Sequence, residues 1–281
     1  MAQAEQTVDS ILKKLDDKAK TRSMSIWIPS LKKHVQFRRL TLGQQKSLIK
    51  SSIQENMLKL DFSGNIYTII KNNVISKNIN PDEFNIIDKI CIGVAYRSRD
   101  INNEYGFYTD DGFFEVDLND ILANIEKIDT QDAFLAKDIE NEKIVITIQI
   151  PTLKSDKELN RLLLKKYADI PDNDDDIKDM LTDLYIYEAA KYITRVTIKE
   201  DPEVVINEET KEETSVNKDT VIDFKSMTPH KKVQIIEKLP TDLINRITII
   251  SDKVQSLEAL LLDVNAGDQI ATIEVNSTFF A

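Results

Sequence analysis

Cysteine, glycine and long apolar runs are all scarce in this chain, and each shortage excludes a class of protein. The single cysteine, Cys91, can form neither an internal disulfide nor a cluster of thiolate metal ligands, so a reducing compartment is expected. Six glycines in 281 residues leave little bare backbone for phosphate-binding loops. No stretch approaches the roughly 18–20 apolar residues of a membrane helix. The polar N-terminus also lacks the apolar core of a signal peptide, so the sequence predicts a cytoplasmic protein without a membrane partner.

Motifs of the common enzyme classes are missing as well. The sequence contains no GxxxxGK[ST], GxGxxG, HExxH or GxSxG pattern. His34 and His230 lie far apart in the chain, and no nucleophile with an orienting carboxylate stands beside either. Cys91 falls within an apolar helical stripe, where a free cysteine usually fills the core. We therefore expect no enzymatic activity and no cofactor.

The acidic run Asp172-Asn173-Asp174-Asp175-Asp176 resembles the first half of a calcium-binding loop. The sixth position of such a loop turns sharply and is normally glycine, but here it is Ile177. The twelfth position is normally a bidentate glutamate, but here it is Asp183. We interpret the run as a loop whose last acids cap the following helix, with a metal-dependent hydrolase as a remote alternative.

The overall charge of −11 is divided unevenly along the chain. Residues 1–50 hold 11 basic and 4 acidic side chains, a net charge of +7, so the rest carries −18. A basic head on an acidic body suggests docking to another protein or contact between head and body, although a charged surface can also serve solubility alone. We do not expect a nucleic-acid partner, because the overall charge is negative and no binding motif is present. The basic residues near Trp27 and Phe37 that such a partner would need are Lys32, Lys33, Arg38, Arg39, Lys46 and Lys50.

Alternating apolar residues predict β-hairpins near both ends of the chain. One is expected at 23–40, and a second at 104–117, where Gly112 can take a positive φ in the turn. A third is expected after Gln255, with LEALLLDV and QIATIEV as its strands. A further strand is expected at 143–150.

Start signals predict that most of the remaining chain is helical. Capping patterns open helices at Thr41-Leu42-Gly43-Gln44, Asn80-Pro81-Asp82-Glu83 and Ser155-Asp156-Lys157-Glu158. Later helices are expected from Asp175 or Asp176 to about Ile193, from Pro229 to Leu239 and from Pro240 to about Val254. Two predicted apolar faces are Phe84, Ile87, Cys91, Val94 and Ala95, and Leu181, Leu184, Tyr185, Ala189 and Tyr192. The predicted fold is α+β, with short antiparallel β-hairpins near both ends and a mainly helical middle and C-terminal half.

Four parts are expected along the chain. Residues 1–22 form an amphipathic arm, and residues 23–153 form an α+β domain. Residues 154–255 form a helical region with an exposed acidic hairpin or loop at 199–219, and residues 256–281 form a hairpin and tail.

Several short sequence segments follow one another along the chain. The strand pair at 26–36 leads into Phe37-Arg38-Arg39-Leu40-Thr41-Leu42-Gly43-Gln44-Gln45-Lys46, and a helix runs from Pro81-Asp82-Glu83-Phe84 to Ala95-Tyr96-Arg97-Ser98. Val116-Asp117-Leu118-Asn119-Asp120, a strand ending in Pro151-Thr152-Leu153, and the terminal Phe279-Phe280 follow. In this order the chain resembles the baseplate hub and hub-assembly family of T-even-type phages. It departs from members that carry a cysteine pair in the last hairpin, so no zinc is inferred, and its arm and acidic excursion are extra.

The resemblance implies a non-enzymatic structural or assembly protein that acts through protein–protein contacts in the central hub of a contractile-tail baseplate. Implied partners are other baseplate and hub proteins and the tape-measure protein, in the host cytoplasm during assembly. Homo-oligomerisation and presence in the virion stay open, and a transient chaperone absent from the mature virion is the alternative. The residues expected to bind partners are Val8, Ile11, Leu12, Leu15, Arg38, Arg39, Phe279 and Phe280. For the terminal phenylalanines, folding back onto the body is an equal alternative.

Overall fold

The chain forms two compact units in a computed structural model. Unit 1 comprises residues 1–130, 152–157 and 256–281, and unit 2 comprises residues 131–151 and 158–255. The boundary falls inside two helices, α7 (Leu153–Lys166) and α10 (Thr241–Leu262), so each of them contributes residues to both units. The structure describes residues 8–11, 13–15, 18, 21–53, 60–127, 136–167, 173–201, 203–206, 213–216 and 218–281.

Unit 1 contains the antiparallel hairpin of β1 (Ser23–Ile28) and β2 (Lys33–Arg38), which confirms the prediction for 23–40. Met24, Ile26 and Ile28 alternate along β1 and are all buried, because successive side chains of a strand point to opposite faces. The strands are joined by the 3-10 turn η1 (Pro29–Leu31).

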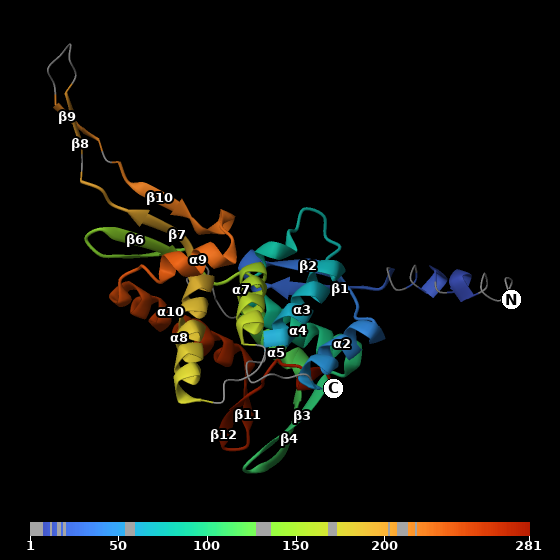
Figure 1. Ribbon diagram of the computed structural model, residues 1–281. Helices are drawn as coiled ribbons and strands as arrows, with labels where there is room; N and C mark the ends of the chain where they lie inside the picture. The colour runs from blue at the N-terminus through green and yellow to red at the C-terminus, as the bar shows by residue number, and fades with distance from the viewer. Residues whose placement is uncertain are drawn as a thin grey trace. The chain divides into compact units, whose positions relative to one another are not determined.

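The helices of unit 1 cover this hairpin with apolar residues. The predicted capping box at Thr41 is confirmed, since Gln44 N donates to Thr41 Oγ1 at 3.2 Å and Thr41 N donates to Gln44 Oε1 at 3.0 Å. Fully buried members of the shared core include Phe37, Leu48, Ile66 and Ile87. Figure 1 labels α2 (Leu42–Ile53), α3 (Leu60–Asn73), α4 (Ile86–Tyr96) and α5 (Leu118–Lys127); α4 ends in the π-helical turn η3 (Arg97–Ile101).

Two further hairpins of unit 1 lie against each other. They are β3 (Glu104–Thr109) with β4 (Gly112–Asp117), and β11 (Asp263–Ala266) with β12 (Gln269–Thr272) (Figure 1). Gly112 and Gly267 take positive φ in the two turns, at 130° and 67°. A Cβ atom on Gly267 would lie 3.4 Å from the Phe114 ring, so the turn of one hairpin contacts a side chain of the other.

Unit 2 is built on a four-stranded antiparallel sheet with the order β10-β7-β6-β5. Ile139, Ile146 and Val196 stand opposite one another across three strands and are buried together. The pairing of β8 with β9 makes the acidic excursion at 199–219 a hairpin. The strands are β5 (Lys137–Glu140), β6 (Ile144–Ile148), β7 (Ile193–Ile198), β8 (Glu203–Ile206), β9 (Glu213–Val216) and β10 (Thr220–Asp223), and the helices complete in this unit are α8 (Asp174–Tyr192) and α9 (Pro229–Ile236).

Two helices start at positions other than those predicted. Asn80 caps only the 3-10 turn η2 (Pro81–Glu83), because Asn85 and Asp88 form a reciprocal capping box that starts α4 at Ile86. Helix α7 starts before Ser155, because Thr152 Oγ1 accepts a hydrogen bond from Ser155 N. The apolar stripe predicted for α4 is nonetheless buried: Phe84, Ile87, Cys91, Val94 and Ala95.

The apolar face predicted for α8 is partly wrong. Leu181 and Tyr185 are exposed, whereas Ala189 and Tyr192 are buried as expected. Asp183 lies on the buried side, where it pairs with Lys166 and accepts a hydrogen bond from Tyr167. These contacts offset the cost of burying the carboxylate, so the face of α8 that carries Asp183 can be buried.

The last hairpin is shorter than predicted. Helix α10 continues to Leu262, so LEALLL is helical and only residues 263–272 form the hairpin. A short apolar run fits a buried strand and a helix equally well, and here the run continues an existing helix. Helices combined with small antiparallel sheets make the fold α+β, as predicted. Within the described ranges, no helix combines the length and apolarity needed to cross a bilayer.

Asp88 joins the start of α4 to the η1 turn. Its carboxylate accepts hydrogen bonds from Ser30 N at 3.0 Å, Ser30 Oγ at 2.6 Å and Asn85 N at 3.0 Å. These donors favour the ionised carboxylate, but burial disfavours it more strongly and raises the pKa of Asp88 to about 6.

The stability of unit 1 should therefore fall as pH rises from about 4 to about 6. Over this range the folded state binds more protons at Asp88 than the unfolded state does, and the raised pKa corresponds to about 3 kcal/mol. Asp88→Asn should lose this pH-dependent part, although it weakens the hydrogen bonds at every pH. Urea unfolding followed by the fluorescence of Trp27, the single tryptophan, measures both proteins. Parallel pH profiles for the wild type and the variant would contradict this prediction.

Candidate protein-interaction site

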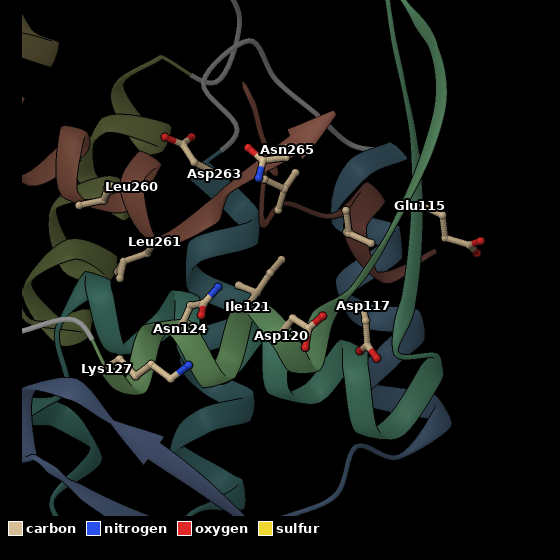
Figure 2. A pocket seen from close by; sticks show the side chains of 12 residues that line it. Glu115, Asp117, Asp120, Ile121, Asn124, Lys127, Leu260, Leu261, Asp263 and Asn265 are labelled. Atoms are coloured by element: carbon tan, nitrogen blue, oxygen red, sulfur yellow. The ribbon is translucent and has the colours of Figure 1, made fainter. Parts of the chain in front are cut away.

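A groove of about 670 Å³ opens in unit 1 between α5 and the segment that passes from α10 into β11. Figure 2 shows Ile121 rising from α5 toward β11, with Asp120 near the start of the helix and Lys127 at its end. Leu261 lines the opposite side. Because Ile121 and Leu261 are buried while the flanking polar side chains are exposed, the groove has an apolar floor and a polar rim.

The rim of this groove is acidic. Asp117, Asp120 and Asp263 are exposed along it, and Lys127 is the one basic side chain among the lining residues. Asp117 also caps α5, since its carboxylate accepts a hydrogen bond from Asn119 N at 2.8 Å, which lowers the pKa of Asp117. The surrounding segments, 104–127 and 256–281, together contain 11 acidic and 1 basic side chains. Such a surface favours a partner of positive charge.

The outer face of the β3–β4 hairpin carries an exposed aromatic pair. Tyr108 and Phe113 stand opposite each other in the ladder, with ring centroids 5.1 Å apart. They are 82% and 57% exposed, although aromatic side chains usually bury most of their surface. The Phe113 ring covers Gly106, where a Cβ atom would overlap it, so a larger residue there would displace Phe113. Exposed aromatic side chains of this kind are typical anchors for a binding partner.

Three of the four apolar residues predicted to form the N-terminal docking face are described by the structure. Residues 8–11 and 13–15 are helical, and Val8, Ile11 and Leu15 are 54%, 51% and 58% exposed. Leu12 lies outside the described residues. More than half of each described apolar side chain is therefore open to solvent or to a partner.

Arg38 and Arg39, the predicted basic contacts, are engaged within unit 1. Arg39 Nε donates to Asp100 Oδ1 at 2.5 Å, and Leu40 N donates to the other oxygen of that carboxylate at 2.7 Å. Arg38 donates to the Asn72 carbonyl at 3.5 Å. These contacts give both arginines a role in holding β2 against neighbouring segments.

Phe279 and Phe280 do not form the exposed anchor that was one of their two predicted roles. Both are fully buried, and Phe280 contacts Phe62 with ring centroids 5.9 Å apart. Arg97 Nε donates to the Phe279 carbonyl at 2.9 Å. A Cβ atom on Gly93 would lie 2.7 Å from Val275 Cγ1, so the tail packs closely against α4. The tail folds back onto the body, because burial of two aromatic rings outweighs the entropy lost by ordering the chain end.

The histidines, the cysteine and the acidic run do not meet in one site. His34 lies on the surface, 3.3 Å from Glu126, and His230 is exposed in the other unit. Cys91 is buried, and burial raises the pKa of its thiol. Asn173 caps α8 by accepting from Asp176 N at 2.9 Å. Among the described residues, which leave out Asp172, no three potential ligands gather into a metal site.

Unit 2 carries a groove of different chemistry. It has a volume of about 430 Å³ and lies between the sheet and α9. Its lining includes Ile144, Ile198 and Ile222, with Lys231 from α9 and Lys238 just after that helix. The two units therefore offer surfaces of opposite charge.

Comparison with known proteins gives no relative, since no protein-family model, curated protein or solved structure matches the chain. The groove of unit 1 was not predicted from the sequence, because Asp120 and Asp263 are far apart in the chain and meet only after folding. The excess of acids in 104–127 and 256–281 is the sequence signal that could have pointed to it.

Phe280→Ala should destabilise unit 1 by about 3–5 kcal/mol, because it removes a fully buried ring. Phe113→Ala is the matched control, since the same change at an exposed position should cost less than about 1 kcal/mol. Urea unfolding followed by Trp27 fluorescence reports on unit 1. Equal losses in the two variants would contradict the burial of the tail.

Proposed function

We propose that this chain is a non-enzymatic structural or assembly protein of a contractile phage tail, acting in the central hub of the baseplate through protein–protein contacts. The observation that carries the proposal is that the sequence segments resembling the hub family are hydrogen-bonded to one another in unit 1. Arg97 and Gln45 donate to the carbonyls of Phe279 and Phe280 at 2.9 and 3.1 Å.

The remaining segments that resemble the family are linked by hydrogen bonds in the same unit. Leu153 N, at the end of the Pro-Thr strand segment, donates to the Phe84 carbonyl at 2.7 Å. Ser98 Oγ donates to Asn119 Oδ1 at 2.8 Å, which links the end of the second segment to the third. Residues that meet in one core constrain one another, so these five segments are parts of one fold.

The surface of unit 1 supports a role in binding other proteins. The Tyr108–Phe113 pair, the acidic groove and the apolar arm are features of protein interfaces. The implied partners are hub proteins and the tape-measure protein, met in the host cytoplasm during assembly. The proposal has two forms: the chain stays in the virion as a structural protein, or it leaves as a chaperone. Mass spectrometry of purified virions distinguishes them.

Co-expression of the tagged chain with hub and tape-measure proteins of a T-even-type phage should yield a co-purifying complex. Tyr108→Ser with Phe113→Ser should reduce recovery of the partners at least about tenfold, because exposed aromatic anchors contribute strongly to interface energy. Leu181→Ser with Ile249→Ser, two equally exposed apolar residues of unit 2, is the matched control and should leave recovery unchanged. Recovery of the chain without any tail protein would contradict the proposed function.

A further inference from the structure

The outer face of the β3–β4 hairpin combines two aromatic rings with acidic side chains. The turn beside the Tyr108–Phe113 pair consists of Asp110 and Asp111, and both are exposed. On the other side of the rings the next residue of β4 on this face is Glu115, which is also exposed. The hairpin holds five acidic and no basic side chains in all. Its exposed rings are therefore the apolar centre of a uniformly acidic surface.

The groove of unit 2 has the complementary composition. Seven of the ten described residues that line it are apolar, and the charged ones are Lys231 and Lys238. Among the residues that the structure describes, neither lysine side chain has a hydrogen bond or an ion pair. The groove thus offers an apolar surface together with two cations that are available to a partner.

The groove is open because one end of the apolar face of the sheet is incompletely covered. Ile146 and Val196 stand opposite each other on β6 and β7 and are buried. The next pair on the same face, Ile144 and Ile198, is partly exposed, and Ile198 reaches 38%. Removing such side chains from water stabilises a complex, so this end of the sheet favours an apolar anchor.

The charges at the rim select the kind of anchor. Lys231 lies in the first turn of α9 and Lys238 lies just after its last, so a cation flanks each end of this helical wall. An anchor with basic neighbours would be repelled, whereas one with acidic neighbours is attracted. The hairpin has acids on both sides of its rings, with Asp110 and Asp111 on one side and Glu115 on the other. It therefore matches the groove in both apolarity and charge.

We propose that the tip of the β3–β4 hairpin of one copy of this chain, with Tyr108 and Phe113 as anchors, binds the unit 2 groove of a second copy. The two surfaces differ, so two copies can exchange hairpins about a two-fold axis, or successive copies can form a ring. This inference deepens the proposed function and rests on it only in treating the hairpin as an interaction surface. Its test uses the purified full-length chain alone, so its failure is distinguishable from failure of the hub proposal.

Sedimentation equilibrium of the purified chain, from about 1 to about 100 µM, should show an oligomer that dissociates on dilution and weakens in high salt. Tyr108→Ser with Phe113→Ser should raise the dissociation constant at least about tenfold, because it removes both anchors. Leu181→Ser with Ile249→Ser removes two exposed apolar side chains that do not line the groove and should have no such effect.

A charge reversal tests the groove. Lys231→Glu with Lys238→Glu should also raise the dissociation constant at least about tenfold, because the new carboxylates repel the acidic hairpin. Lys165→Glu with Lys253→Glu changes the net charge equally at exposed positions of unit 2 outside the groove and should leave association unchanged. Circular dichroism checks that each variant is folded.

Mixing the two defective proteins tests whether the hairpin and the groove meet each other. The variant without the aromatic pair keeps its groove, and the variant with reversed lysines keeps its hairpin. At a concentration where each is monomeric alone, an equal mixture should form a dimer joined by one contact. A wild type that is monomeric at every concentration, an oligomer insensitive to either pair of changes, or a mixture that stays monomeric would each overturn the proposal.

Discussion

Unit 1 is held together by the burial of two aromatic rings at the end of the chain. Phe279 and Phe280 insert among α2, α3 and α4, and their carbonyls are bound by side chains 182 and 235 residues away in sequence. Arg97 is itself largely buried, so its guanidinium is desolvated and has to be matched by carbonyl acceptors. The aromatic burial and the arginine network therefore depend on each other.

Charge is distributed unevenly over the surface. Basic and acidic side chains concentrate in different parts of the sequence, and folding then brings acidic residues from distant segments together. Residues 20–50 hold eight basic and no acidic side chains, while α5 and two hairpins from distant parts of the sequence gather acids on one region of unit 1. The β3–β4 hairpin keeps aromatic rings on both faces, with Tyr105 turned to Phe279 and Tyr108 turned to solvent. A partner that binds this region would thus contact apolar side chains surrounded by negative charge.

Local patterns were sufficient to predict the hairpins at 23–40 and 104–117, because alternation and a turn glycine act within a few residues. They failed where two signals competed. Asn80 and Asn85 both fit the N-cap position of a helix. Helix α4 starts after Asn85 because Asp88 completes a capping box with it. LEALLL fits a strand as well as a helix, and only the preceding turns of α10 resolve it. The groove lay beyond such patterns, because its walls come from residues 115–127 and 260–265, which are far apart in the sequence.

The division of unit 1 among three stretches of sequence has a consequence for its synthesis. Unit 2 is encoded almost without interruption between them, so all of its residues have been translated before the chain ends. Unit 1 cannot complete its core until Phe280 has left the ribosome. A product terminated before Phe280 would therefore lack a finished unit 1 and could not present its surfaces to other molecules.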